Sequence, residues 1–210
     1  MSATVAIIDY GRGNVRSVAN ALEYCGADTV VTADAGAIDD ASHIVLPGVG
    51  AFGDAMAELQ ARGLPEILHR QVLEKRKPFL GICLGMQLLA DRGLEHGAHD
   101  GLGWLAGEVV RLEPRPDSLK IPHMGWNDVE VKTGHPVFAG FRPSALTFYF
   151  VHSFHFRAAS PASILATCDY GGPFTAAVAK DNIVATQFHP EKSQDSGIQF
   201  LENFVKWTPS

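Results

Sequence analysis

Short apolar runs that end in glycine-rich turns recur along the first half of the chain, and residues with helical spacing follow them. The expected strands of this half cover residues 5–10, 28–32, 43–46 and 78–82, and the expected helices cover residues 15–22, 52–75 and 84–90. Strands that alternate with helices need right-handed crossovers. This half therefore predicts a parallel sheet with helices on both faces.

The second half has a different pattern. Its expected strands cover residues 107–112, 129–132, 147–153, 163–167, 174–179 and 183–188, with a hairpin turn at 180–182 and a closing amphipathic helix at 193–207. No convincing helix separates the first four of these strands, which favours antiparallel pairing. Segments 94–101 and 113–122 are expected to be surface loops. We predict an α/β fold with an open, mostly parallel sheet flanked by helices and an antiparallel C-terminal portion, in one domain over residues 1–210.

Charge and composition exclude several classes of protein. The 210 residues carry 17 basic and 23 acidic side chains, a net charge of −6, and no basic cluster is denser than residues 74–77. Binding to nucleic acid or to an anionic membrane surface is therefore not expected. No apolar run approaches the roughly 18 residues of a membrane span, and the N-terminus lacks the features of a secretory signal. With 3 widely spaced cysteines, we expect no disulfide framework and a cytoplasmic location.

The strongest chemical signal is the string Gly-Ile-Cys-Leu-Gly at residues 81–85, where an expected strand gives way to an expected helix. This is the glycine spacing of a nucleophile elbow, a sharp turn that presents its central side chain at the edge of a sheet. Such a turn leaves no room for side chains at Gly81 and Gly85. Cys83 would stand at a helix N-terminus, which favours the thiolate, and the Leu84 N–H would face a developing oxyanion. Most free cysteines are small buried hydrophobes, so the elbow by itself leaves a structural role open.

A candidate partner for the cysteine follows the last expected strand, in the string Gln-Phe-His-Pro-Glu at residues 187–191. Ligands bind at the carboxyl edge of such sheets, where this string and the elbow should meet. On an extended segment, His189 and Glu191 would point the same way. Glu191 could then hold one ring nitrogen of His189 while the other faces the thiol. A structural histidine remains an alternative, and two ligands do not make a zinc site, so we expect no metal.

Two glycine-rich loops need separate interpretation. Residues 47–50, Pro-Gly-Val-Gly, follow a strand, and the backbone at Gly48, Val49 and Gly50 could approach a ligand closely, although a tight turn explains the glycines equally well. Residues 11–14, Gly-Arg-Gly-Asn, lack the third glycine and the acidic residue of a dinucleotide fingerprint. We therefore expect no nucleotide site there and no cofactor.

Together these motifs resemble those of the triad-type, class I glutamine amidotransferases. Three further strings are similar to those of one branch, the glutaminase subunits of imidazole glycerol phosphate synthases. They are Asp-Tyr-Gly-Arg-Gly-Asn at 9–14 with Ser-Val at 17–18, Pro-His-Met-Gly-Trp-Asn at 122–127, and His-Pro-Glu-Lys-Ser-Gln at 189–194. The resemblance extends from Val5 to Trp207, whereas the loops at 94–101 and 113–120 match no motif of the family.

The resemblance implies a role for each matching residue. Cys83 would be the nucleophile, His189 the general base and acid, and Glu191 the residue that orients His189. The implied oxyanion residues are Gly48, Val49, Gly50 and Leu84; the implied glutamine-binding residues are Gln87, Val151, His152 and Ser153, within the segment 149–153; the implied partner-facing residues are Asn14, Ser17, Trp126 and Lys192. Without the resemblance, Lys192 would be taken as a solvated lysine and Trp126 as a core aromatic residue.

The resemblance also implies the reaction and a partner. Glutamine would be hydrolysed to glutamate and ammonia through a cysteine thioester, and ammonia would pass to a (β/α)8-barrel cyclase subunit in a heterodimer. The cyclase makes imidazole glycerol phosphate and a carboxamide ribonucleotide in histidine biosynthesis, and the glutaminase stays idle until the partner is engaged. We expect a peptide of the 48–50 loop to reorient at that point. A cysteine peptidase or γ-glutamyl hydrolase on the same fold, and a binding subunit with a vestigial triad, are the alternatives.

Overall fold

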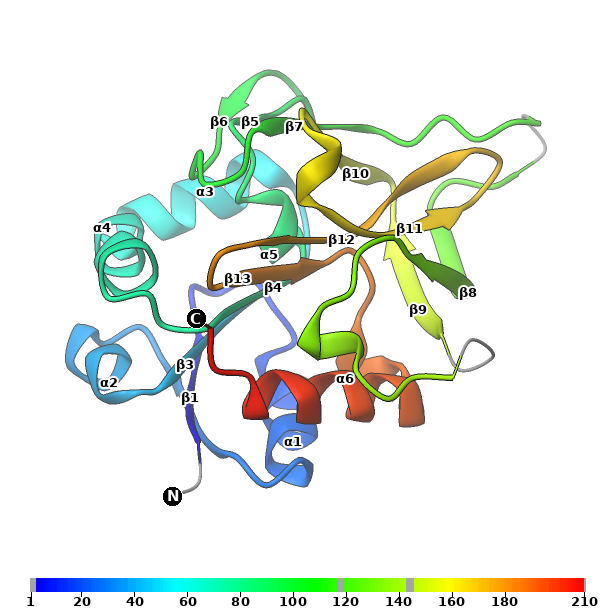
Figure 1. Cartoon of the computed structure of the whole chain (residues 1–210). Helices are drawn as coiled ribbons and strands as arrows, with labels where there is room; N and C mark the ends of the chain where they lie inside the picture. Colours follow the sequence, from blue (N-terminus) through cyan, green and yellow to red (C-terminus); the bar gives the residue numbers. More distant parts are fainter. Residues whose placement is uncertain (1–2, 117–118, 143–145, 210) are drawn as a thin grey trace.

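The computed structural model describes residues 3–116, 119–142 and 146–209, and in it the strands form one large and one small sheet (Figure 1). The strands of the large sheet lie in the order β2-β1-β3-β4-β13-β12-β11-β8-β9. The smaller sheet has the order β10-β7-β5-β6. None of the helices in the described residues combines the length and apolar character that a membrane span requires.

The first half forms the parallel part of the large sheet. Its elements are β1 (Thr4–Ile8), α1 (Val15–Tyr24), β2 (Asp28–Thr32), α2 (Ala35–Asp40), β3 (His43–Gly48), α3 (Phe52–Ala61), α4 (Leu64–Leu68), the π-helical turn η1 (His69–Glu74), β4 (Phe79–Cys83) and α5 (Leu84–Gln87). Strands β2, β1, β3 and β4 pair in parallel, as predicted. The short helix α2, with Ile38 as its single fully buried residue, was not predicted, because so short an amphipathic segment carries little periodic signal.

The helix expected at 84–90 is wrong in its length, since α5 ends at Gln87. The backbone carbonyls of Leu88, Leu89 and Ala90 instead accept hydrogen bonds from the N–H groups of residues 102–105. Tertiary contacts thus end the helix earlier than its apolar residues suggest.

The second half supplies the antiparallel strands. Its elements are β5 (Arg92–Gly93), β6 (His99–Asp100), β7 (Gly107–Arg111), β8 (His123–Val131), η2 (Pro136–Phe138), β9 (Thr147–His152), β10 (Phe154–Ala158), η4 (Pro161–Ser163), β11 (Ile164–Asp169), β12 (Pro173–Lys180), β13 (Ile183–Thr186), η5 (Pro190–Lys192) and α6 (Gln194–Lys206). The predicted hairpin between β12 and β13 is confirmed. Strand β13 then pairs in parallel with β4, which joins the two halves into one sheet.

The predicted fold class is confirmed, and the antiparallel portion is larger than expected. Every pairing from β13 through β12, β11 and β8 to β9 is antiparallel. Strand β8 begins at His123, well before the expected start at 129, and the short strands β5, β6 and β10 were not predicted. Strand β6 also lies within the segment 94–101 that we expected to be loop. The expected loop at 113–122 includes residues 117–118, which lie outside the described part of the chain.

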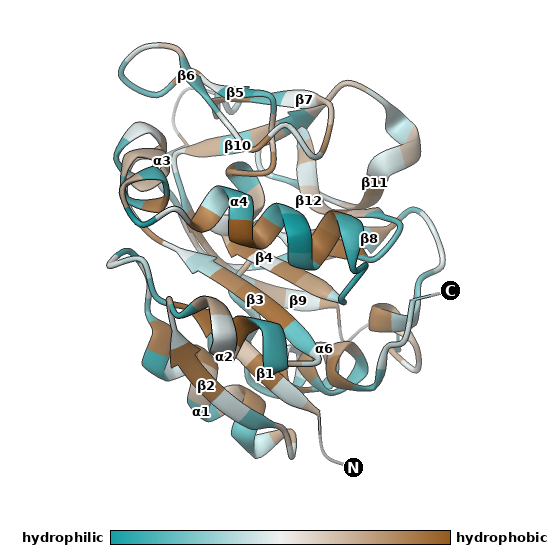
Figure 2. Cartoon of the chain, turned by 90° about the vertical axis from the view of Figure 1, so that its left-hand side faces the viewer, coloured by the Kyte–Doolittle hydropathy of each residue, from teal (hydrophilic) through white to brown (hydrophobic). Residues whose placement is uncertain are grey.

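Each face of the parallel strands buries a different set of side chains. Val5 and Ile7 of β1 belong to a cluster that includes the inner faces of α1 and α6, whereas Ala6 and Ile8 belong to a cluster with α3 and α4. The alternation follows from the period of two along a strand. Figure 2 shows β3 and β4 largely in the hydrophobic colour, next to helices that carry both hydrophobic and hydrophilic turns. The sheet is therefore covered on both faces, which leaves its carboxyl edge as the place for a site.

Candidate active site

Cys83 occupies a strained turn between β4 and α5. Its backbone angles are φ 56° and ψ −110°, a region that residues with a side chain rarely adopt and that costs about 1–3 kcal/mol. Cys83 is the N-terminal cap residue of α5. This is the predicted strand–turn–helix geometry of a nucleophile elbow, and it places the cysteine at the carboxyl edge of the parallel sheet.

Glycine is required on both sides of this turn. A Cβ atom on Gly85 would lie 1.8 Å from the carbonyl oxygen of Leu46, and one on Gly81 would lie 2.8 Å from the carbonyl oxygen of Gly85. A third glycine, Gly48, pairs with Cys83 across the strands, and a Cβ there would lie 2.9 Å from the Leu84 Cβ. The steric reason predicted for Gly81 and Gly85 is therefore confirmed by the backbone contacts.

His189 and Glu191 form a buried pair near the cysteine. The His189 Nδ1 lies 2.8 Å from the Glu191 Oε1, and the two side chains are 3% and 2% exposed. The geometry expected for this contact is wrong, because Glu191 belongs to the 3-10 turn η5 and not to an extended segment. Pro190 starts that turn, which folds Glu191 back onto the ring. The His189 Nε2 is buried without a hydrogen-bond partner among the described residues, so it is free to act on the cysteine.

The surroundings of His189 favour its charged form. Burial lowers the pKa of His189, but the negative charges of Cys83 and Glu191, together with the hydrogen bond to Glu191, outweigh burial and raise this pKa to about 10. A thiolate paired with an imidazolium is the reactive state of a cysteine nucleophile.

Cys83 and His189 line the same cavity, which has a volume of about 520 Å³. Its lining residues are Val49, Gly50, Ala51, Cys83, Leu84, Gln87, Glu95, Val151, His152, Ser153, Phe154 and His189. Most of the residues expected at the site thus come together in one cavity. Gly48 and Glu191 do not line it: Gly48 lies beside Cys83 on the neighbouring strand, and Glu191 holds the far side of the His189 ring.

Existing hydrogen bonds limit what the expected glutamine-binding groups can offer. The Gln87 Nε2 donates to the Phe154 carbonyl at 2.9 Å and to the Gln187 Oε1 at 3.0 Å, so its Oε1 is the atom left for a ligand. Both ring nitrogens of His152 are also engaged, with His123 and with the Phe154 carbonyl. The segment 151–153 therefore meets a ligand mainly through its backbone and the Ser153 side chain.

Two polar side chains of the site, those of Glu95 and Gln187, carried no assignment from the sequence. Glu95 lines the cavity and accepts the Phe52 N–H at the start of α3 through its Oε2, at 2.9 Å. The Gln187 Nε2 donates to the Cys83 sulfur at 3.6 Å. Glu95 lies in a loop without a motif, and its partner is 43 residues away in the chain. Gln187 stands in the same string as His189, and the expected burial of that strand end was the signal that could have identified it.

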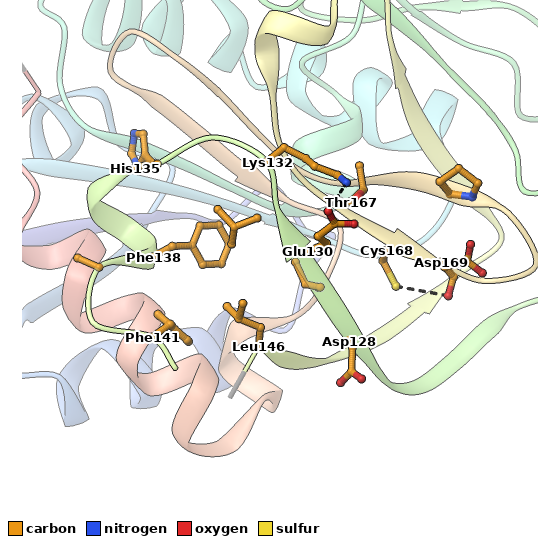
Figure 3. A pocket seen from close by; sticks show the side chains of 15 residues that line it. Asp128, Glu130, Lys132, His135, Phe138, Phe141, Leu146, Thr167, Cys168 and Asp169 are labelled. Atoms are coloured by element: carbon orange, nitrogen blue, oxygen red, sulfur yellow. Dashed lines mark hydrogen bonds and ion pairs between the residues drawn. The ribbon is translucent and has the colours of Figure 1, made fainter. Parts of the chain in front are cut away.

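A larger cavity of about 780 Å³ lies elsewhere, between β8, β11 and the segment around η2. Figure 3 shows Phe138, Phe141 and Leu146 grouped on one side of it and Asp128 and Asp169 on the other. Burial and neighbouring carboxylates raise the pKa of the thiol of its cysteine, Cys168, to about 12, which disfavours the reactive thiolate. Chemistry, not size, therefore identifies the Cys83 cavity as the candidate active site.

The expected partner-facing residues lie in two places. Trp126 is 47% exposed, and its ring centroid lies 6.1 Å from that of Tyr149. The Lys192 Nζ lies 5.9 Å from the Tyr149 ring centroid, so these three side chains form one cluster. Asn14 caps α1 by accepting the Ser17 N–H, and α1 contacts the turn η5 that carries Lys192. Asn14 and Ser17 therefore also have a local structural role.

Comparisons with known proteins agree with this geometry. The family model described as glutamine amidotransferase class-I matches residues 6–207. The chain is 54% identical to the imidazole glycerol phosphate synthase subunit HisH 2 of Nitrobacter winogradskyi, over 99% of this chain and 100% of the relative. It is 50% identical to the subunit HisH of Rhodospirillum rubrum, over 98% of this chain and 99% of the relative.

Solved structures share the fold at lower identity. PurLQS from Thermotoga maritima superposes with a TM-score of 0.76 at 21% identity, covering 98% of this chain and 99% of that chain. A glutamine amidotransferase from the same organism gives a TM-score of 0.61 at 21% identity, covering 91% of this chain and 77% of that chain. At this identity the likeness establishes the fold alone.

We predict that Cys83→Ala lowers the pKa of His189. The substitution removes the cysteine charge that raises this pKa, and burial then opposes only Glu191. Nitrogen-15 NMR of the ring, followed over pH in both proteins, should show a lower His189 pKa in the variant than in the wild type. His123, whose pKa burial lowers to about 4, should stay neutral at neutral pH in both proteins. An unchanged titration of His189 would mean that Cys83 is too far away to influence the ring.

Proposed function

The chain belongs to the class I glutamine amidotransferase family, and we propose that it is the glutaminase subunit of an imidazole glycerol phosphate synthase in histidine biosynthesis. One observation supports this reaction most directly: Cys83 on its strained elbow shares a cavity with His189, whose Nδ1 is bound by Glu191. Nucleophile, base and orienting carboxylate are the groups that acyl transfer needs. In this proposal the whole chain acts as one amidotransferase domain.

The first half of the reaction breaks the side-chain amide of glutamine. The Cys83 thiolate attacks the amide carbon and forms a carbon–sulfur bond. His189 gives its proton to the departing nitrogen, so ammonia leaves and a γ-glutamyl thioester remains on Cys83. Water, deprotonated by His189, then attacks the thioester and releases glutamate together with the free cysteine. Glu191 keeps the ring oriented through both steps.

Charge on the attacked oxygen needs N–H donors close to Cys83. The Leu84 N–H follows the nucleophile directly, and Val49 and Gly50, which follow the strand partner of Cys83, also line the cavity. An oxyanion donor contributes about 2.7–4 kcal/mol to the transition state. Because Gly48 packs closely against Tyr10 and α5, we place the change of the loop at the peptides that follow it. Reorientation of one such peptide is how we propose that the partner switches on the site.

The α-ammonium and the α-carboxylate of glutamine need opposite charges from the protein. Glu95 brings a carboxylate into a cavity where the Gln87 Oε1 also accepts, and together they suit the α-ammonium group of the substrate. The Ser153 side chain and the backbone of 151–153 suit the α-carboxylate. Glutamine would then lie with its side-chain amide at Cys83 and its α-carbon toward Glu95.

Ammonia must leave the site without meeting bulk water, because protonation to ammonium destroys its nucleophilicity. We propose that a (β/α)8-barrel cyclase subunit receives it in a heterodimer, without involvement of nucleic acid. The docking face would contain Trp126, Tyr149 and Lys192, and Asn14 and Ser17 of α1. Trp126 pairs with Tyr149 on β9, the strand that also carries Val151, and Lys192 ends the turn η5 that His189 caps. In this proposal, a partner bound there would cover the mouth of the cavity.

We predict that Cys83→Ala abolishes glutamine-dependent activity of the complex and spares ammonia-dependent activity. Loss of the nucleophile should lower the glutamine-dependent rate by about 10⁴-fold or more. Formation of imidazole glycerol phosphate from added ammonium salt should persist, because the cyclase chemistry lies on the partner. The assay follows product formation with each nitrogen source, and Cys25→Ala, outside the cavity, is the control. Equal glutamine-dependent rates for wild type and Cys83→Ala would refute the catalytic assignment.

Glu95→Gln should weaken glutamine binding. Losing a charge-assisted contact to the α-ammonium corresponds to a rise in KM of about 10-fold to 100-fold, with a smaller change in kcat. Glutaramic acid, which lacks the α-amino group, should be hydrolysed equally well by wild type and variant. Steady-state kinetics with both substrates distinguishes recognition of the ammonium from general damage, and Glu66→Gln on α4 serves as the control. If both substrates lose activity equally, Glu95 does not recognise the ammonium group.

Trp126→Ala should weaken association with the cyclase subunit. Exposed tryptophans at interfaces commonly contribute about 2 kcal/mol or more, which corresponds to a rise in Kd of about 30-fold. Isothermal titration calorimetry with the cyclase partner measures this change. Tyr24→Ala, at a residue that is 78% exposed and lies at the end of α1, should leave Kd unchanged. If Trp126→Ala and Tyr24→Ala changed Kd by the same factor, the docking face would not be at Trp126.

A further inference from the structure

A chain of hydrogen bonds leads from the middle of β8 to the wall of the cavity. The Asn127 Nδ2 lies 3.3 Å from the His123 Nε2, and the His123 Nδ1 lies 3.1 Å from the His152 Nε2. The His152 Nδ1 lies 2.9 Å from the Phe154 carbonyl oxygen. Because His123 and His152 face each other on the paired strands β8 and β9, the link crosses directly between them.

The donor and the acceptor of every hydrogen bond in this chain follow from the groups at the two ends of the chain, the Phe154 carbonyl and the Asn127 amide. A carbonyl oxygen only accepts, so the His152 Nδ1 donates to it and the His152 Nε2 must accept. The His123 Nδ1 therefore donates to His152, which leaves the His123 Nε2 to accept from the Asn127 amide nitrogen. The Asn127 orientation is independently fixed, since its Nδ2 also donates to the Asp169 carbonyl and its Oδ1 accepts the Asp128 N–H. Both rings are thus neutral, with the proton on Nδ1.

Burial and stacking keep His123 in this arrangement. His123 is 2% exposed and His152 is 6% exposed, and burial lowers the pKa of His123 to about 4 and that of His152 to about 3. The His123 ring stacks between Tyr170 and Phe150, with centroid distances of 4.0 Å and 4.9 Å. Rotation of the ring would break both the stack and the hydrogen bonds.

The hydrogen-bond chain continues from the Phe154 carbonyl to Gln187, a side chain that contacts the nucleophile. The Phe154 carbonyl, which accepts from His152, also accepts from the Gln87 Nε2. The second Gln87 N–H holds the Gln187 Oε1, and this turns the Gln187 Nε2 toward the Cys83 sulfur. The Phe154 carbonyl therefore links the histidine pair to Gln87, which lines the cavity, and through Gln87 to Gln187, which contacts the Cys83 sulfur.

We propose that His123 is a positioning residue for glutamine hydrolysis, which donates a hydrogen bond to His152 and so fixes the Phe154 carbonyl and Gln87. The inference rests on the proposed function of the Cys83 site and adds to it a residue outside the cavity. Without the His123 donor, the His152 Nε2 is a buried acceptor with no partner. The His152 ring can then rotate or take up a proton, and the wall at 151–154 loses its fixed position.

The test compares two substitutions at one position in the complex with the cyclase subunit. His123→Phe keeps an aromatic ring in the stack and deletes the donor, whereas His123→Asn retains an N–H near the position of Nδ1. We expect His123→Phe to raise KM for glutamine about tenfold with a smaller change in kcat, and His123→Asn to restore KM toward the wild-type value. His43→Phe is the matched control, because His43 is also buried and packs against an aromatic ring, Phe204.

Three outcomes would overturn the proposal. KM could stay unchanged in His123→Phe, it could rise equally in His43→Phe, or it could stay high in His123→Asn while the thermal stabilities of the two His123 variants match. Nitrogen-15 NMR of the wild-type protein tests the geometry separately, since protons on Nε2 of either ring would contradict the hydrogen-bond chain. If the wild-type complex hydrolyses no glutamine, the proposed function fails, while the NMR result still decides whether the chain exists.

Discussion

The backbone at Cys83 is the constraint on which the rest of the site depends. A positive φ at a residue with a side chain persists only where its surroundings enforce it, and here β3, β4 and α5 approach so closely that Gly48, Gly81 and Gly85 admit no Cβ. This packing presents the sulfur at the carboxyl edge of the sheet. It also places the Leu84 N–H next to the nucleophile and brings the start of the 48–50 loop beside Cys83.

The antiparallel half of the sheet supplies the site residues that the parallel half lacks. Strand β13 joins the two halves and delivers His189 and, through the turn η5, Glu191. Strand β9 and the start of β10 form the wall that faces Cys83. The hydrogen bonds from Asn127 through His123 and His152 tie this wall to β8, whose exposed residues Met124 and Trp126 face outward. Substrate wall and docking face are thus neighbouring parts of one antiparallel pair.

The features of the fold and of the site that depend on short stretches of sequence could be predicted from the sequence. The glycine spacing predicted the elbow at Cys83, and the apolar runs predicted β1 to β4 and most of the helices between them. Long-range contacts decided the rest: the 102–105 segment ends α5 early, and Pro190 folds Glu191 onto His189 where an extended segment was expected. The contact of Glu95 with Phe52 and the proton order in His123 and His152 depend on partners distant in the chain, so no local pattern predicts them.

Release of glutamate from glutamine by the purified chain, measured alone and with the cyclase partner and its nucleotide ligand, tests the central claim most directly. A glutaminase whose oxyanion loop reorients on docking should release glutamate slowly alone and much faster when the partner and ligand are added. Fast release that ignores the partner would contradict the account. It would mean a self-sufficient hydrolase, and the docking face around Trp126 would lose its role.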